Sequence, residues 1–87
     1  MAIKLLVNAA PDPYSDQVAA AVMAALGHRP ESEEWTISIL SGQPRGCIVS
    51  IERPDGGSSS WQFEDCGDAP IKDRIREELR REGYSWL

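Results

Sequence analysis

The sequence predicts an α+β domain with the element order β-α-β-β-β-α, folded as a two-layer sandwich. Short segments that alternate between apolar and polar residues indicate strands with one buried face, and two longer segments with helical apolar spacing indicate amphipathic helices. The polar outward positions of the strands indicate that one face of the sheet is uncovered. We therefore expect a mostly antiparallel four-stranded sheet with both helices on one face, in a single domain spanning residues 1–87.

The first strand and the first helix are predicted in the N-terminal third of the chain. Residues 3–8 form an apolar run that is typical of a strand. One side of this strand is expected to carry Ile3, Leu5 and Val7. Asp12 followed by Pro13 is typical of a helix start, because an acidic N-cap and a proline in the first turn both suit the unpaired backbone N–H groups there. The alanine-rich run that follows is expected to end at Gly27.

Three further strands are predicted in the middle of the chain. Residues 35–39 alternate strictly, with an inward side formed by Trp35, Ile37 and Ile39. Residues 47–53 and 59–64 predict a hairpin joined through a glycine-rich turn. We expect a three-residue loop at 55–57. In that register Ile51 lies opposite Trp61, Val49 lies opposite Phe63 and Cys47 lies opposite Asp65.

The last helix is predicted from its start signal, its apolar stripe and its stop. Asp68 can cap it, and Pro70 is tolerated in its first turn. The buried stripe repeats every four residues at Ile71, Ile75 and Leu79. Gly83 is expected to end the helix.

Charge and hydropathy restrict the possible partners and locations. Nine Lys and Arg against 14 Asp and Glu leave a net charge of -5. This balance disfavours direct binding to nucleic acid or to an anionic membrane and favours a basic protein partner. The apolar runs are far shorter than the roughly 20 residues of a membrane span, and the N-terminus lacks the pattern of a secretory signal. We therefore expect a cytoplasmic protein.

The two cysteines give little indication of chemistry. Cys47 and Cys66 do not form a disulfide framework, and with one histidine they cannot fill a structural zinc site, so we expect no metal and no cofactor. In the expected register Cys47 points inward and Cys66 lies on the other face, so a disulfide is not expected. Cys66 lies near the start of the last helix, where the helix dipole can activate a thiol, although neighbouring acids oppose this effect.

Candidate binding residues come from the acids and from two aromatic residues at the C-terminus. The acids that could form a partner-binding surface are Glu31, Glu33, Glu34, Glu52, Glu64 and Asp65. Tyr84 and Trp86 follow the last helix and either pack against it or remain exposed as anchors for a partner, because aromatic residues are enriched at interface hot spots. On the uncovered sheet face, Leu6, Leu40 and Ile48 could form a small apolar patch.

The sequence favours binding over catalysis, because no nucleophile, base and orienting group can be assembled from it. The leading hypothesis is a small acidic interaction or inhibitor module that blocks a larger, basic macromolecular partner. A phage-type inhibitor of a nucleic-acid-handling complex, such as an anti-CRISPR protein, fits the size and the charge. One alternative is a thiol or redox protein that depends on Cys66. A second alternative is a homodimer paired through an edge strand, so the choice between monomer and homodimer stays open.

Overall fold

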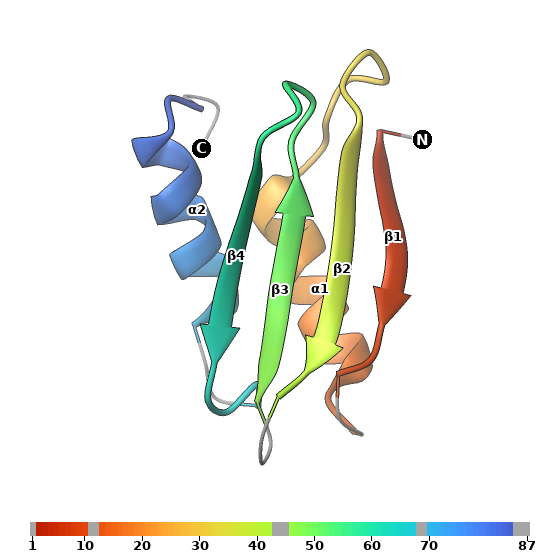
Figure 1. Cartoon of the computed structure of the whole chain (residues 1–87), viewed down its shortest axis with the longest axis vertical. Helices are drawn as coiled ribbons and strands as arrows, with labels where there is room; N and C mark the ends of the chain where they lie inside the picture. Colours follow the sequence, from red (N-terminus) through yellow and green to blue (C-terminus); the bar gives the residue numbers. More distant parts are fainter. Residues whose placement is uncertain (1, 11–12, 43–45, 68–69, 85–87) are drawn as a thin grey trace.

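The computed structural model describes residues 2–10, 13–42, 46–67 and 70–84. Its strands and helices occur in the predicted order β-α-β-β-β-α (Figure 1). The elements are β1 (Ile3–Asn8), α1 (Ser15–Leu26), β2 (Trp35–Ser41), β3 (Cys47–Glu52), β4 (Ser58–Phe63) and α2 (Ile71–Arg81). The α+β class expected from the sequence is confirmed.

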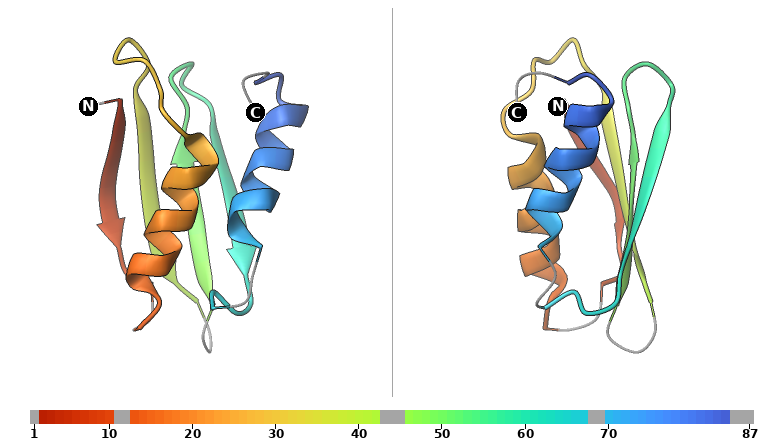
Figure 2. Two further views of the ribbon diagram at one scale, coloured as in Figure 1. Left: turned by 180° about the vertical axis from the view of Figure 1, so that it is seen from behind. Right: turned by 90° about the vertical axis from the view of Figure 1, so that its left-hand side faces the viewer.

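The four strands lie side by side in chain order, β1-β2-β3-β4. β1 pairs with β2 in parallel, whereas the β2–β3 and β3–β4 pairs are antiparallel. The parallel pair needs a long crossover, which α1 provides, and the antiparallel pairs need only short turns. Both helices lie on the same face of the sheet and form the second layer (Figure 2). In the described part of the chain the opposite face of the sheet carries no helix, and we call it the open face.

The core lies between the sheet and the two helices. On β2, Trp35, Ile37 and Ile39 are fully buried, as their alternation predicts. The helix residues buried against the sheet are Val18, Val22, Ala25 and Leu26 of α1 and Ile71, Ile75 and Leu79 of α2. Every buried side chain among the described residues is apolar or a cysteine. The alternating and four-residue patterns therefore select the buried faces of β2 and α2 correctly.

β1 departs from the expected alternation through a β-bulge. Leu5 is level with Ile37 and Val7 is level with Ser38, so Leu6 is the extra residue between them. The bulge turns Val7 toward the side of Ser38, which belongs to the open face. The expectation that Ile3, Leu5 and Val7 share one side was therefore wrong at Val7. Leu5, Leu6 and Val7 are all apolar, so their sequence contains no alternation that could reveal the bulge.

The hairpin forms in a different register from the one expected. Val49 lies opposite Trp61, and Cys47 lies opposite Phe63. The predicted pairs of Ile51 with Trp61, Val49 with Phe63 and Cys47 with Asp65 were therefore wrong by two residues. A shift of two residues keeps each side chain on its own face, so the apolar residues of both strands still point into the core.

The hairpin loop explains this register. The backbone N–H of Arg53 donates to the carbonyl oxygen of Gly57 at 2.7 Å, which encloses a three-residue loop of Pro54, Asp55 and Gly56. Gly56 has a φ of 91°, in the left-handed region that favours glycine. The loop has the expected three residues but begins at Pro54, one residue earlier than predicted. Proline suits the first loop position and glycine suits the last, left-handed position, and this combination favours the observed loop.

The C-terminal ends of the two helices agree with the prediction from the sequence better than their N-terminal ends do. α1 begins at Ser15 with Tyr14 at the N-cap, so Pro13 precedes the helix instead of opening it. The predicted caps Asp12 and Asp68 lie outside the described residues. Gly27 follows α1, as expected.

α2 ends where Gly83 predicts, but Pro70 precedes the helix instead of lying in its first turn. Pro70 is its N-cap residue, and Gly83, with a φ of 101°, follows its last turn. Within the described residues, α1 and α2 have 12 and 11 residues, and neither has the length and continuous apolarity needed to cross a bilayer.

Candidate functional site

The open face of the sheet brings together exposed side chains of several strands. The outward residues of β2 are Thr36, Ser38 and Leu40, and those of β3 are Ile48, Ser50 and Glu52. They pair across the two strands as Thr36 with Glu52, Ser38 with Ser50 and Leu40 with Ile48. The open face therefore changes along the strands from a carboxylate, through hydroxyl groups, to aliphatic side chains.

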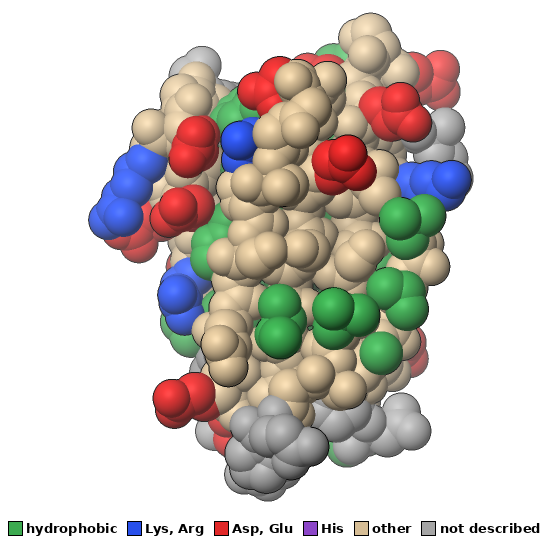
Figure 3. Space-filling model, in the orientation of Figure 1, with side chains coloured by type: hydrophobic (Ala, Val, Ile, Leu, Met, Phe, Trp, Pro, Cys, Tyr) green, Lys and Arg blue, Asp and Glu red, His purple; other side chains and the backbone are tan. Residues whose placement is uncertain are grey.

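The apolar end of this face exposes several large side chains. Leu40 is 46% exposed, and on β1 Leu6 and Val7 are 58% and 41% exposed. Ile48 lies opposite Leu40 and is half-buried. Figure 3 shows hydrophobic side chains gathered in the lower part of this face, over the ends of β1, β2 and β3. We call Leu6, Val7, Leu40 and Ile48 the apolar strip.

The middle of the open face is a shallow groove lined by hydroxyl groups. It has a volume of about 280 Å³ and reaches from Leu6 on β1 to Ser58 on β4, past Thr36, Ser38, Ser50 and Glu52. Across β3 and β4, the Oγ atoms of Ser50 and Ser60 lie 2.8 Å apart in a hydrogen bond. Each hydroxyl can both donate and accept, so this band can satisfy the polar backbone groups of a bound segment.

Two of the six candidate acids meet at the other end of the open face. Glu34 and Glu52 are both exposed and line one groove of about 240 Å³ together with Thr36 and the hairpin loop. Within the described residues, neither carboxylate forms an ion pair. Lys4 is level with Thr36 on β1 and contributes one opposite charge to this end. Glu34 and Glu52 are therefore exposed carboxylates that a cationic group could approach.

Glu33 faces the core rather than the open face. Its Oε1 accepts a hydrogen bond of 2.9 Å from the indole N–H of Trp35, and the same oxygen lies 3.6 Å from the Arg29 guanidinium. Trp35 is fully buried, so its indole N–H needs a partner inside the protein. The position of Glu33 is explained by this contact.

The remaining acids lie elsewhere. Glu31 is exposed in the connection between α1 and β2, beside a hollow that includes Met23 and Gly27. Glu64 and Asp65 follow β4, at the end of the sheet opposite to Glu52. The Oδ1 of Asp65 accepts a hydrogen bond of 3.0 Å from the backbone N–H of Gly67. The six acids are therefore divided between the two ends of the sheet.

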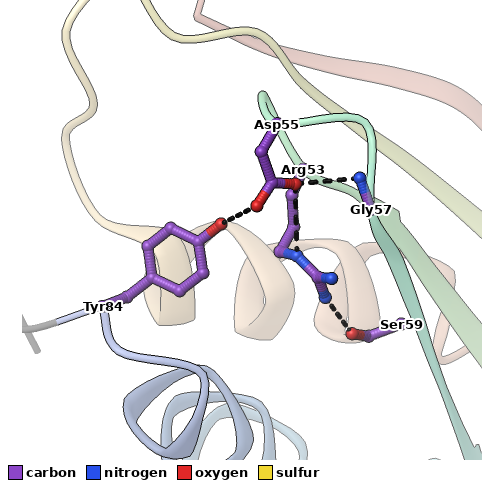
Figure 4. Close-up of polar contacts among 5 residues, drawn as sticks. All are labelled: Arg53, Asp55, Gly57, Ser59 and Tyr84. Atoms are coloured by element: carbon purple, nitrogen blue, oxygen red, sulfur yellow. Dashed lines mark hydrogen bonds and ion pairs between the residues drawn. The ribbon is translucent and has the colours of Figure 1, made fainter.

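Tyr84 packs between the end of α2 and the hairpin loop (Figure 4). Its ring lies 5.4 Å from the ring of Trp35, and its hydroxyl donates to Oδ2 of Asp55 at 3.4 Å. The other oxygen of Asp55 accepts from the Gly57 backbone N–H at 2.8 Å and lies 3.6 Å from the Arg53 guanidinium, which also contacts Ser59. Of the two outcomes left open for Tyr84, the structure has the packed one, and Trp86 lies outside the described residues.

The pKa shifts in this loop follow from its contacts. The Gly57 backbone N–H, together with the nearby Arg53 guanidinium, lowers the pKa of the Asp55 carboxyl. Burial, and then the Asp55 carboxylate, raises the pKa of the Tyr84 hydroxyl. Both shifts favour an ionised Asp55 carboxylate and a protonated Tyr84 hydroxyl, which is the state in which Tyr84 donates to Asp55. This contact therefore holds Tyr84 against the hairpin.

The two cysteines lie together in the core, which corrects the expectation that they lie on different faces. Cys47 is fully buried and Cys66 is 1% exposed. Both are free thiols. Burial, followed by the nearby Cys66, raises the pKa of the Cys47 thiol to about 11. Cys66 lies in the turn after β4 and not on the outward side of a strand, so its side chain is buried in the core.

The chemistry of the described residues gives no metal centre, because no group of three or more His, Cys, Asp or Glu side chains in them is placed to hold an ion. The sequence matches no protein-family model and no curated protein.

Most of the open face is predictable from the sequence, but one residue of the apolar strip is not. Leu40 extends the alternation of β2 onto an outward position, which is a direct signal for an exposed apolar residue. Val7 gave no such signal because the bulge reverses its side. The grouping of Glu34 with Glu52, apart from the other acids, depends on the pairing of β2 with β3 and could not be seen in the sequence.

Proposed function

We propose that this protein is a non-enzymatic protein-binding or inhibitor module whose partner docks on the open face of the sheet. The observation that carries the proposal is the apolar strip beside the hydroxyl-lined groove, on the face that no helix covers. Contiguous exposed apolar side chains rimmed by polar groups are characteristic of interaction surfaces. Leu6 and Leu40 are the expected anchors, since they are the most exposed large apolar side chains described.

The chemistry of the open face favours a partner segment that combines an apolar side chain with a basic one. Leu40 and Thr36 are four residues apart on β2, which corresponds to about 13 Å at roughly 3.3 Å per residue. The apolar side chain would contact Leu40, and the lysine or arginine would reach Glu34 and Glu52 at the other end. Hydroxyl groups between them would pair with the backbone of the segment.

A role without catalysis is supported by the causes of the pKa shifts. Cys47, Asp55 and Tyr84 have shifted pKa values, and each shift follows from core burial or from the hairpin loop contacts. None of the three lines the groove on the open face. In an active site, shifted groups are expected to lie in the cleft that would hold the substrate.

The proposed partner is a larger basic macromolecule in the cytoplasm. The net charge of -5 supports a basic partner, because complementary charge speeds encounter and selects the partner. Proteins that handle nucleic acid are commonly basic, so a phage-type inhibitor of such a complex remains the specific form of the proposal. A thiol role for Cys66 has less support, since its side chain is 1% exposed and reactive cysteines are partly accessible.

The proposal is tested by capturing partners from host lysate with tagged wild-type protein and two charge variants. Glu34→Gln/Glu52→Gln removes two charges from the open face, and Glu31→Gln/Glu77→Gln removes two exposed charges elsewhere. A protein that the wild type and the Glu31/Glu77 variant retain, that the Glu34/Glu52 variant loses, and that elutes as salt rises supports the proposal. Equal retention by all three proteins would contradict it.

A further inference from the structure

At the edge opposite to β1 the sheet ends at β4, whose outer side pairs with no strand of the described chain. The backbone N–H of Arg53 donates to the carbonyl oxygen of Gly57 at 2.7 Å, so these residues form a hydrogen-bonded pair of the hairpin. In an antiparallel ladder such pairs alternate with pairs that do not bond to each other. Counted along the register from this pair, the outward backbone N–H and carbonyl groups belong to Ser58, Ser60 and Gln62.

α2 overhangs this edge of the sheet. Figure 1 shows α2 beyond β4, on the outer side of the sheet, and Figure 2 shows that α2 lies in the helical layer. A groove of about 210 Å³ runs between them, lined by Trp61 of β4 and by Arg74, Glu77, Glu78 and Arg81 of α2. A strand added to β4 would lie about 4.8 Å further out, so it would run along this groove beneath α2.

The α2 side of the groove offers one cation and one carboxylate for a bound segment. Arg81 pairs with Glu77 at 2.9 Å, whereas Arg74 and Glu78 form no ion pair within the described residues. The guanidinium carbon of Arg74 lies 5.0 Å from the centre of the Phe63 ring. Four residues of a helix rise about 6 Å, and two residues of a strand span about 7 Å. Arg74 and Glu78 are therefore spaced like alternate side chains of an extended segment.

We propose that the β4 edge and α2 together bind an extended segment of a partner protein, which joins the sheet as an added strand antiparallel to β4. Antiparallel pairing is the more stable arrangement per residue. Such a segment runs in the same direction as α2, so it meets Arg74 before Glu78 (Figure 1). Its helix-facing side chains are an acid opposite Phe63 and, two residues later, a base opposite Trp61.

A second copy of this chain does not supply the required side chains. None of the four described strands contains an acid followed two residues later by a base. The net charge of -5 on each copy also opposes their association. The occupant is therefore a segment of another protein. This surface is separate from the groove of the open face, so the proposal does not depend on the proposed function.

The proposal is tested by NMR titration of isotope-labelled protein with the blocked peptide Val-Thr-Glu-Thr-Lys-Thr-Val, which presents an acid and a base on one side. We expect saturable shifts and slower hydrogen exchange, largest at the amides of Ser58, Ser60 and Gln62. The peptide with glutamate and lysine exchanged should bind about tenfold more weakly, because two attractive contacts become repulsive. No saturable shift at millimolar peptide, equal binding of both peptides, or the largest shifts on the open face would overturn the proposal.

Matched variants separate the backbone contacts from the charges. Ser60→Pro removes an outward N–H without removing a ladder hydrogen bond, so it should abolish peptide binding, whereas Ser60→Ala should preserve it. Arg74→Glu/Glu78→Lys should reverse the preference between the two peptides. Equal affinity of the proline and alanine variants, or an unreversed preference, would overturn the proposal. The charge reversal does not require the proline variant to fold.

Two further controls separate this surface from the other possibilities. Glu34→Gln/Glu52→Gln should bind the peptide as the wild type does, so a failure of open-face docking and a failure at the β4 edge are distinguishable. A mass near twice 9.6 kDa that returns to the single mass in Ser60→Pro would identify a second copy as the occupant of the edge. That result would overturn the proposal.

Discussion

Glu33 and Glu34 are neighbours in the chain, yet their surroundings differ completely. Glu33 accepts the indole N–H of the buried Trp35, whereas Glu34 is exposed beside Glu52 on the open face. The sequence treated both as members of one acidic surface, because it shows charge but not direction. Both residues precede β2, so the difference comes from the contact that Glu33 makes with Trp35.

The contact between Glu33 and Trp35 gives the first prediction. Glu33→Ala removes the acceptor of a buried indole N–H and should lower the free energy of unfolding by about 1–3 kcal/mol. Glu33→Gln keeps an acceptor oxygen and should cost clearly less. Urea unfolding of the three proteins at pH 7 measures both values. Equal losses for the two variants would mean that the hydrogen bond does not contribute.

The raised pKa of Cys47 gives a prediction about pH. The folded pKa of about 11 lies above the ordinary value of 9.0, so the protonated thiol stabilises the folded state fully below pH 9. This contribution is lost as the pH rises from 9 to 11, and it is of the order of 2 kcal/mol. Urea unfolding of the reduced wild type should therefore weaken more steeply over this range than that of Cys47→Ala. Parallel pH profiles would contradict the burial argument.

At the scale of elements, the hairpin shows why the register was mispredicted. The segment from 54 to 57 contains one proline and two glycines, so more than one three-residue loop satisfies the turn rules. Proline suits the first loop position and glycine the left-handed last position, and this combination selects the observed loop. If Pro54 is assigned to the first loop position, the sequence predicts the observed register.

Gly56 gives a prediction for this loop. A Cβ atom added there would meet no atom within 4 Å, so its cost comes from the φ of 91° alone. Gly56→Ala should therefore lower the free energy of unfolding by about 1 kcal/mol, and Gly56→Asn should lower it less, because asparagine tolerates the left-handed region better. Thermal unfolding of both variants measures this order. A more stable alanine variant would contradict the observed loop conformation.

β2 and α2 were predictable because each has a pattern of one period over its whole length. Trp35, Ile37 and Ile39 alternate, and Ile71, Ile75 and Leu79 repeat at four-residue spacing, so one rule identifies each buried face. β1 was less predictable, because its continuous apolar run conceals the bulge. The start of α1 was also misjudged, since Pro13 can precede a helix as readily as open it.

At the scale of the whole molecule, the layer arrangement determines which surface can bind. Both helices cover one face of the sheet, so the polar and apolar residues of the other face stay exposed together (Figure 2). The sequence predicted this uncovered face, but it could not bring Glu34 and Glu52 together or separate them from Glu64. Those relations arise only when the strands pair.

The edge of the sheet gives a prediction about oligomeric state. β1 is an edge strand with three consecutive exposed apolar residues, a pattern that can promote pairing between chains. Its bulge interrupts the regular edge, and the net charge of -5 on each copy opposes association. Light scattering at micromolar concentration should therefore give a mass near 9.6 kDa. A mass near twice this value would favour the homodimer.

The most direct test of the open face as the binding surface is photo-crosslinking in host lysate. A photoreactive amino acid is placed at Leu40, in the apolar strip, or at Ala24, which is exposed on α1 in the helical layer. We expect one crosslinked protein partner from position 40, lost when Glu34 and Glu52 are changed to glutamine, and none from position 24. Crosslinking of that same partner from position 24 and not from position 40 would contradict docking on the open face.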